Sequence, residues 1–219
     1  MITLIDVMNN AIVKSYVKKA DNFLGIIGYT EHGRRHSKRV AKTAERILKD
    51  LEKKERTITL GSIAGYLHDI GNVINREHHA QTGSVIVHSI LTKMDMPVND
   101  IAEIIGAIGN HHEEDGLPVS DIAAALILAD KSDVHRSRVR NPEFVKFDIH
   151  DRVNYATSKS LLEVDREEKK IIFNLTIDTT IAAVMEYFEI FLSRMVISRR
   201  AADFLSCKFE LIINGTKVI

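Results

Sequence analysis

The stretch Gly65-Tyr-Leu-His-Asp-Ile-Gly71 decides how this chain of 219 residues is interpreted. It places a histidine and an aspartate, His68 and Asp69, side by side at the end of a segment with a helical apolar period. The apolar residues of that period are Leu60, Ile63, Ala64 and Leu67. Gly71 is placed to stop the helix. We therefore expect a helix over residues 59–69 that carries an imidazole and a carboxylate at its C-terminal end.

Two more residues place polar groups on apolar helix faces. His36 lies four residues before Val40 in a predicted helix over residues 35–53, and Asp130 lies four residues after Leu126 in one over residues 120–139. A buried carboxylate without a partner is costly or becomes protonated. A divalent cation between two imidazoles and two carboxylates removes that cost, so these residues predict a metal site. The alternative for Asp130 is a salt bridge with Arg35 or Lys38.

The apolar patterns divide the chain into two regions. Helices are predicted over residues 4–20, 35–53, 59–69, 80–93, 99–111 and 120–139. Beyond Pro142, strand patterns occupy residues 153–164, 171–177, 209–213 and 216–219, with a hairpin turn at 165–170 and a long amphipathic helix over 179–204. We therefore expect a mainly α fold, with a helical domain over residues 1–142 and a small α+β appendage over residues 143–219 packed on it.

Composition restricts the class of protein. Lys+Arg and Asp+Glu both number 30, so no overall field favours a nucleic acid or an anionic membrane, and we expect neither as a partner. The single cysteine, Cys207, excludes an internal disulfide, and no long apolar run reaches the length of a membrane span. We expect a cytoplasmic protein.

For the apolar face of residues 179–204 we expect a structural role, with homodimerisation or closure over the pocket as alternatives.

The ordered set His36, His68, Asp69 and Asp130 resembles the HD superfamily of metal-dependent phosphohydrolases over about residues 36–133. The resemblance implies an HD-domain helical bundle in which these four residues bind a divalent metal ion (Mn, Fe, Zn, Ni or Mg). Two further elements, His79-Ala-Gln-Thr-Gly83 and His111-His112-Glu113, are similar to elements of the branch called HD-GYP. They imply a second metal ion, with Asp69 as the bridge. The alternative is one metal ion, with His79, His111 and His112 binding substrate phosphate.

Three features differ from the HD-GYP branch. Only nine residues separate Asp69 from His79, whereas that branch has a much longer segment. The chain continues as Asp115-Gly-Leu-Pro118 rather than into Gly-Tyr-Pro, and Asn72 stands where a lysine often follows the HD pair. The short spacing is more similar to compact bacterial HD-domain hydrolases that act on nucleotides or other small phosphate esters.

The resemblance implies hydrolysis of a phosphomonoester or phosphodiester bond by a metal-activated water. We expect Asp69 and Lys131 to be catalytic, Asp69 by bridging or orienting that water. Lys131 and Arg35 are expected to hold phosphate oxygens of the substrate. Two alternatives use the same ligands, a non-catalytic sensor of a phosphorylated ligand and a di-iron oxygenase. His32 is a candidate partner behind the site, and His78 is the alternative to His79.

Overall fold

The structure, a computed structural model, describes residues 2–145 and 147–219; Met1 and Lys146, which fall in the two predicted domains, lie outside the described residues. Its α-helices are α1 (Leu4–Asn9), α2 (Ala11–Ile26), α3 (Arg34–Asp50), α4 (Glu55–Leu67), α5 (His79–Lys93), α6 (Val98–Gly109), α7 (Asp121–Lys131), α8 (Ile149–Ala156) and α9 (Val184–Phe204). Short 3₁₀ helices are η1 (Ile70–Val73), η2 (Arg136–Arg138) and η3 (Pro142–Phe144). The strands are β1 (Thr157–Asp165), β2 (Lys170–Ile177), β3 (Lys208–Ile213) and β4 (Thr216–Lys217).

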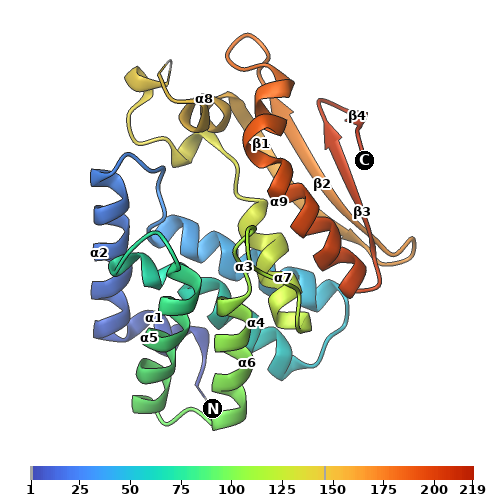
Figure 1. Cartoon of the computed structure of the whole chain (residues 1–219). Coiled ribbons are helices and arrows are strands. Elements are labelled where there is room, and N and C mark those ends of the chain that lie inside the picture. The colour runs from blue at the N-terminus through green and yellow to red at the C-terminus, as the bar shows by residue number, and fades with distance from the viewer. Residues whose placement is uncertain (1, 146) are drawn as a thin grey trace.

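The helices α1 to α7 pack together, and a small sheet with α9 lies at one end of them (Figure 1). The sheet order is β1-β2-β3-β4, with antiparallel outer pairs and a parallel central pair, β2 and β3, that α9 connects. The predicted mainly α fold with a C-terminal sheet is thus confirmed. Within the described residues, no helix combines the length and the apolar character that crossing a bilayer requires.

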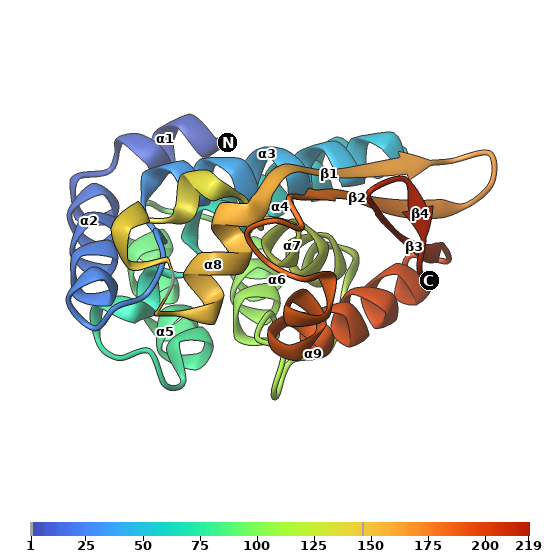
Figure 2. The ribbon, with the colours of Figure 1, turned by 90° about the horizontal axis from the view of Figure 1, so that it is seen from above.

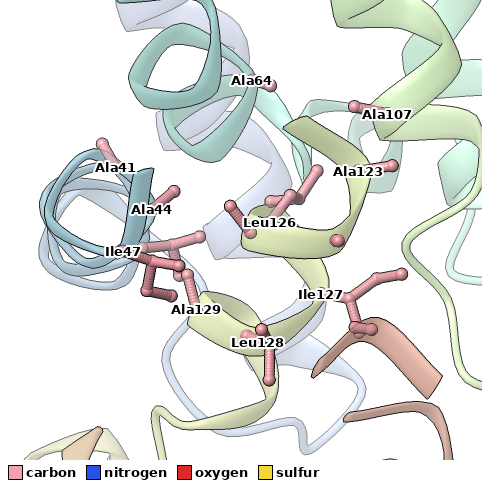
Figure 3. Packing of buried hydrophobic residues seen from close by; sticks show 14 of the residues in the cluster. Ala41, Ala44, Ile47, Ala64, Ala107, Ala123, Leu126, Ile127, Leu128 and Ala129 are labelled. Atoms are coloured by element: carbon pink, nitrogen blue, oxygen red, sulfur yellow. The ribbon is translucent and has the colours of Figure 1, made fainter. Parts of the chain in front are cut away.

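Helix α7 forms the centre of the core. All residues from Ile122 to Ala129 are buried, and α7 contacts α3, α4, α6 and α9. Figure 3 shows its side chains beside Ala44 and Ile47 of α3 and facing Ala64 of α4 and Ala107 of α6. Small alanines at these contacts allow the helix axes to approach closely. This packing fixes the C-terminal end of α7, and with it Asp130, relative to α3 and α4.

The sheet shares its core with the helices. Alternate residues of β2 are buried, as the period near two predicted, and the same holds for β3. Helix α9 packs on β2 and β3 and also on α7, and in Figure 2 it lies on the opposite side of the sheet from α3. Most of the buried apolar residues form one cluster that runs from α1 to β3. The division into two domains at residue 142 stays a prediction, but the apolar core is continuous across it.

Several element ends differ from the predicted ones. The helix predicted over 4–20 is two helices, because Asn10 has an extended backbone and its side chain caps α2 by accepting from the amides of Ile12 and Val13. The helix predicted to reach residue 139 ends at Lys131. The strand predicted from residue 153 begins only at Thr157, since α8 occupies the residues before it. Side-chain caps and tertiary contacts outweigh the apolar period at these ends.

Gly71 has a different role from the predicted one. Helix α4 already ends at Leu67, and Gly71 lies inside η1. A Cβ at Gly71 would lie 2.0 Å from the carbonyl oxygen of His79 and 2.6 Å from the amide nitrogen of Gly83. Glycine therefore permits close contact between η1 and the first turns of α5. That contact brings His79 towards Asp69.

Candidate metal centre

The four predicted ligands meet at one point between α3, α4 and α7. The Nε2 atom of His36 lies 3.2 Å from Nε2 of His68, 3.5 Å from Oδ2 of Asp69 and 3.3 Å from Oδ1 of Asp130. The Nε2 atom of His68 lies 3.3 Å and 3.5 Å from the same two carboxylate oxygens. His36, His68 and Asp130 offer ligand atoms that all lie within 4.8 Å of one another. This His/Asp cluster fits a metal site.

The electrostatics of the cluster favour a cation. Burial raises the pKa values of Asp69 and Asp130, but neighbouring cationic groups outweigh it and hold both pKa values well below the usual range. Burial lowers the pKa of His68, but these two carboxylates outweigh it and raise that pKa to about 10. In the metal-free protein a proton on His68 therefore balances part of the carboxylate charge, and a bound metal ion would take over that role.

The second ring nitrogen of three histidines is held by the backbone. His68, His79 and His111 each donate Nδ1–H to the carbonyl three residues earlier, at 2.9, 2.9 and 2.6 Å. A carbonyl oxygen only accepts, so the hydrogen bond fixes a proton on Nδ1 and the orientation of the ring. In each case Nε2 is the nitrogen that faces the cluster, which is the usual arrangement behind a metal ligand.

Asp133 contacts the cluster through His36, and sequence reasoning missed it. His36 donates Nδ1–H to Oδ2 of Asp133 at 2.7 Å, and Arg35 and Arg39 both pair with the same fully buried carboxylate at 2.9 Å. Burial raises the pKa of Asp133, but the His36 hydrogen bond and the nearby arginines hold it well below the usual range. Its spacing of three from Asp130 gave little signal because α7 ends between them. The salt bridge of Arg35 considered for Asp130 is made to Asp133 instead.

A second group of histidines lies on the other side of Asp69. Oδ1 of Asp69 lies 3.6 Å from Nε2 of His79, which is 3.2 Å from Nε2 of His111. Asn72 donates to the same Oδ1 at 3.0 Å. Burial lowers the pKa of His79 to about 4 and also lowers the pKa of His111. Both imidazoles are therefore neutral near pH 7, as a metal ligand must be.

His112 and His78 differ from these histidines in position. The ring of His112 is half-buried and lies 5.0 Å from the His79 ring, but its nitrogens are nearest to Glu113 and Asp115, at 3.9 and 3.7 Å. His78 is exposed and has a left-handed backbone, so His79 is the histidine that enters the site. His32 is buried on the cavity wall with its ring 5.5 Å from the His36 ring.

Lys131 is buried behind Asp130. Its Nζ lies 2.8 Å from Oδ2 of Asp130 and contacts Glu113, which in turn accepts from Arg194 of α9 at 3.2 Å. Lys131 thus fixes the outer oxygen of Asp130 while Oδ1 faces the histidines. Its predicted contact with a substrate phosphate stays a prediction.

A cavity of about 930 Å³ lies beside the cluster. Its walls come from the loop before α3, the start of α5, the 112–115 loop, α8 and α9. Arg76 stands on the wall, with Nη1 3.9 Å from Oδ1 of Asp69 and 3.5 Å from Nε2 of His79, and sequence reasoning did not single it out. Arg35 does not line this cavity but a second groove, between α3 and β1. Its predicted contact with substrate phosphate at the metal centre stays a prediction.

Comparison with known proteins identifies a family whose matched region includes the residues of this cluster. The family profile of the HD domain matches residues 33–135, which include the whole first cluster. An uncharacterized protein of Methanocaldococcus jannaschii is 31% identical over 189 residues, which cover 75% of this chain and 70% of that protein. The chain belongs to the HD domain family. The resemblance found in the sequence is therefore confirmed at the level of the family.

Two other similarities to this HD-domain protein are shorter. Ribonuclease Y of Lawsonia intracellularis is 35% identical over 106 residues, which cover 47% of this chain but 18% of that protein. The crystal structure of a predicted HD superfamily hydrolase from an uncultured Thermotogales bacterium aligns with a TM-score of 0.46 and 23% identity. That alignment covers 57% of this chain and 67% of the other.

Proposed function

We propose that this HD-domain protein hydrolyses a phosphate ester with a divalent metal ion held by His36, His68, Asp69 and Asp130. The proposal depends on one observation above all. Oδ2 of Asp69 is buried and has no hydrogen-bond partner among the described residues, although two imidazoles surround it. A buried carboxylate oxygen left in this way is costly, and a cation removes the cost.

The donor set limits the metal and its chemistry. Imidazole nitrogens and carboxylate oxygens together suit Mn, Fe, Zn or Ni, whereas Mg prefers oxygen ligands alone. When bound, such an ion supplies a Lewis acid and lowers the pKa of a water molecule. Asp69 has oxygens towards both histidine groups, so it is the residue that we expect to orient the attacking water. Arg76, on the cavity wall, is placed to bind a non-bridging phosphate oxygen.

We further propose that a second ion is held by Asp69, His79 and His111. The two oxygens of Asp69 face different groups: Oδ2 faces His36 and His68, and Oδ1 faces His79. His68, Asp69 and His111 also offer ligand atoms within 4.8 Å of one another. A carboxylate between two such groups is the usual bridge of a two-metal phosphoesterase site. His112, at the cavity wall, is then available to the substrate.

The substrate proposed is a nucleotide or another small phosphate ester. The cavity volume of about 930 Å³ is sufficient for a molecule of that size. Both monoesters and diesters are included, because the name of the Lawsonia relative, Ribonuclease Y, refers to cleavage of a diester. The cavity wall carries three arginines, Arg76, Arg138 and Arg194, beside six carboxylates. Arg194 is paired with Glu113, so Arg76, whose Nη1 lies 3.9 Å from Oδ1 of Asp69, is the cation that we expect to bind the phosphate.

The test combines metal analysis with a hydrolysis screen. Purified protein is expected to contain a transition metal ion and to hydrolyse p-nitrophenyl esters or nucleotides. Asp69→Ala removes a ligand of both proposed sites, so it is expected to lose the metal and the activity together. Asp203→Ala, an exposed carboxylate of α9 without an ion pair among the described residues, is the matched control and is expected to keep both. Full activity of a metal-free Asp69→Ala protein would reject the proposal.

Two further arms separate the alternatives. His111→Ala is expected to reduce the metal content from two ions to one, and an unchanged content would reject the second ion. Metal binding without hydrolysis of any phosphate ester would favour a sensor of a phosphorylated ligand. Oxygen consumption by the iron-loaded protein, in the absence of hydrolysis, would favour a di-iron oxygenase.

A further inference from the structure

A second hollow of the molecule, between α3 and β1, is strongly basic. This groove has a volume of about 480 Å³ and shares no lining residue with the cavity at the metal centre. Its cationic lining residues are Arg35, Lys38, Arg39, Lys42 and Arg46, all on α3, and no aspartate or glutamate lines it. The formal net charge of the chain is +0, so this concentration of positive charge is local and does not reflect composition. We name it the α3 groove.

Helix geometry sets the spacing of these charges. Each of the five lies three or four residues from at least one other, so they share one face of α3. From Arg35 to Arg46 the helix rises by about 16 Å at 1.5 Å per residue. The arrangement is therefore a line of positive charge along the groove. A single phosphate would contact only part of it.

Most of this charge lacks an acidic partner. Lys38 and Lys42 are exposed, and neither makes an ion pair or hydrogen bond with its ammonium group among residues 2–145 and 147–219. Arg46 donates to the carbonyl of Leu162, an uncharged acceptor that holds the guanidinium beside β1 without neutralising it. Among the groove cations, only Arg35 and Arg39 pair with a carboxylate in the described residues: both pair with Asp133, and Arg35 pairs with Glu31 as well. These positive charges repel one another because they lie close together, and a bound anion would reduce that repulsion.

The remaining lining indicates the kind of anion. The groove has hydroxyl groups from Thr43 and three serines, and its apolar residues are Leu161 and Leu162. No phenylalanine, tyrosine or tryptophan lines it, and the imidazole of His135 has its two nitrogens bonded to Ser137 and to the carbonyl of Ser158. The groove therefore lacks the large aromatic surfaces on which single-stranded nucleic acids are usually stacked. Cations and hydroxyls without a stacking surface suit phosphate groups themselves rather than bases.

We propose that the α3 groove binds an oligophosphate, a small ligand with two or more linked phosphates, at a site separate from the metal centre. Lys38 and Lys42 supply ammonium groups that no carboxylate neutralises, and the carbonyl of Leu162 in β1 positions the guanidinium of Arg46 beside the groove. The site also has a physical link to the metal centre. Arg35 and Arg39 pair with Asp133, which orients His36, so a bound oligophosphate would compete for the guanidinium groups that surround that carboxylate.

The test uses inorganic tripolyphosphate and the whole chain, treated with a chelator, in calorimetric titrations at low salt. Chelation matters because tripolyphosphate would otherwise bind a metal ion at the other site. The variant Lys38→Ala/Lys42→Ala is expected to weaken binding about tenfold or more, since hydrogen bonds to charged groups are lost. The matched control is Arg34→Ala/Lys49→Ala, which removes the same charge from exposed positions of α3 that do not line the groove. It is expected to bind nearly as tightly as the unaltered protein.

Equal weakening by the two double variants would mean general attraction to a basic helix and would overturn the proposal. A single-stranded DNA oligonucleotide gives the second arm, and binding that is much tighter than that of tripolyphosphate and increases with strand length would replace the oligophosphate by a nucleic acid. The Asp69→Ala variant is expected to bind tripolyphosphate normally. The titration therefore tests the α3 groove independently of the proposed metal-dependent hydrolysis.

Discussion

At the scale of single residues, Asp133 is the fully buried carboxylate that needs most compensation from its neighbours. It is fully buried, and its carboxylate accepts from His36 and pairs with Arg35 and Arg39. A buried charge is tolerated only when it is paired and hydrogen-bonded, and here both carboxylate oxygens have donors. The same bonds fix the ring of His36, so a residue outside the proposed ligand set controls one ligand. Removal of its charge should therefore affect metal binding more than its distance from the ion would suggest.

The substitution Asp133→Asn tests this role. An amide keeps the shape but not the charge, so His36 loses basicity and orientation, and we expect metal affinity to fall by about 10–100-fold. The measurement is calorimetric titration of the metal-free protein with Mn²⁺, with circular dichroism to verify folding. Asp121→Asn, which removes a partly exposed carboxylate paired with Lys53, is the control and should bind normally. An unchanged affinity of Asp133→Asn would show that the hydrogen bond to His36 is dispensable.

At the scale of elements, the contact between η1 and α5 joins the two histidine groups. Asp69 immediately precedes η1, and His79 begins α5. The two backbones approach so closely at Gly71 that no side chain fits between them. The distance of 3.6 Å between Asp69 and His79 therefore depends on a glycine that binds nothing itself.

Gly71→Ala should destabilise the protein by about 1–3 kcal/mol, because the added methyl group overlaps backbone atoms that must shift. The matched control is Gly106→Ala in α6, where an added Cβ meets no atom within 4 Å. That change should be neutral or stabilise by about 0.5–1 kcal/mol, since alanine is the better helix former. Urea unfolding followed by circular dichroism measures both. Equal stability of the two variants would mean that η1 and α5 can separate without cost.

At the scale of the whole molecule, α7 and α9 connect the helical part to the sheet. Helix α7 is buried on all sides, and α9 supplies one of those sides while it also covers β2 and β3. Arg194 of α9 adds a polar link through Glu113 to Lys131, directly behind Asp130. The C-terminal region therefore supports the metal cluster from behind and lines its cavity.

A shared core predicts one cooperative unfolding transition. Calorimetry of the metal-free chain should give a single peak, with the calorimetric enthalpy equal to the van't Hoff enthalpy. The metal must be absent, because a tightly bound ion would raise the stability of the helical part alone. Two resolved peaks would show that residues 143–219 unfold independently, as a separate domain would.

The proportion of the site that could be predicted differs from residue to residue. His36, His68 and Asp130 each continue an apolar helix stripe, so spacing alone indicated that they face the interior, and the structure brings them together. His79 and His111 were indicated by their resemblance to elements of the HD-GYP branch. Asp133 and Arg76 were not found, because they lie in connecting segments without a period. Glu113 was quoted only as part of the His111-His112-Glu113 element, and its contact with Lys131 was not predicted. Arg35 was expected at the metal centre, but it follows the outer face of α3 into another groove.

Sequence patterns alone were enough to predict the helical class, the HD family and the residues of the two histidine groups. These depend on local periods and on the order of a few residues, which the chain contains directly. Three features became visible only in the folded chain: which oxygen of Asp69 faces which histidines, the bond by which Asp133 orients His36, and the groove beside β1 to which α3 presents its cations. The physical reason is that these contacts join residues far apart in the chain. The packing of α7 and α9 sets their geometry, and no local sequence pattern predicts it.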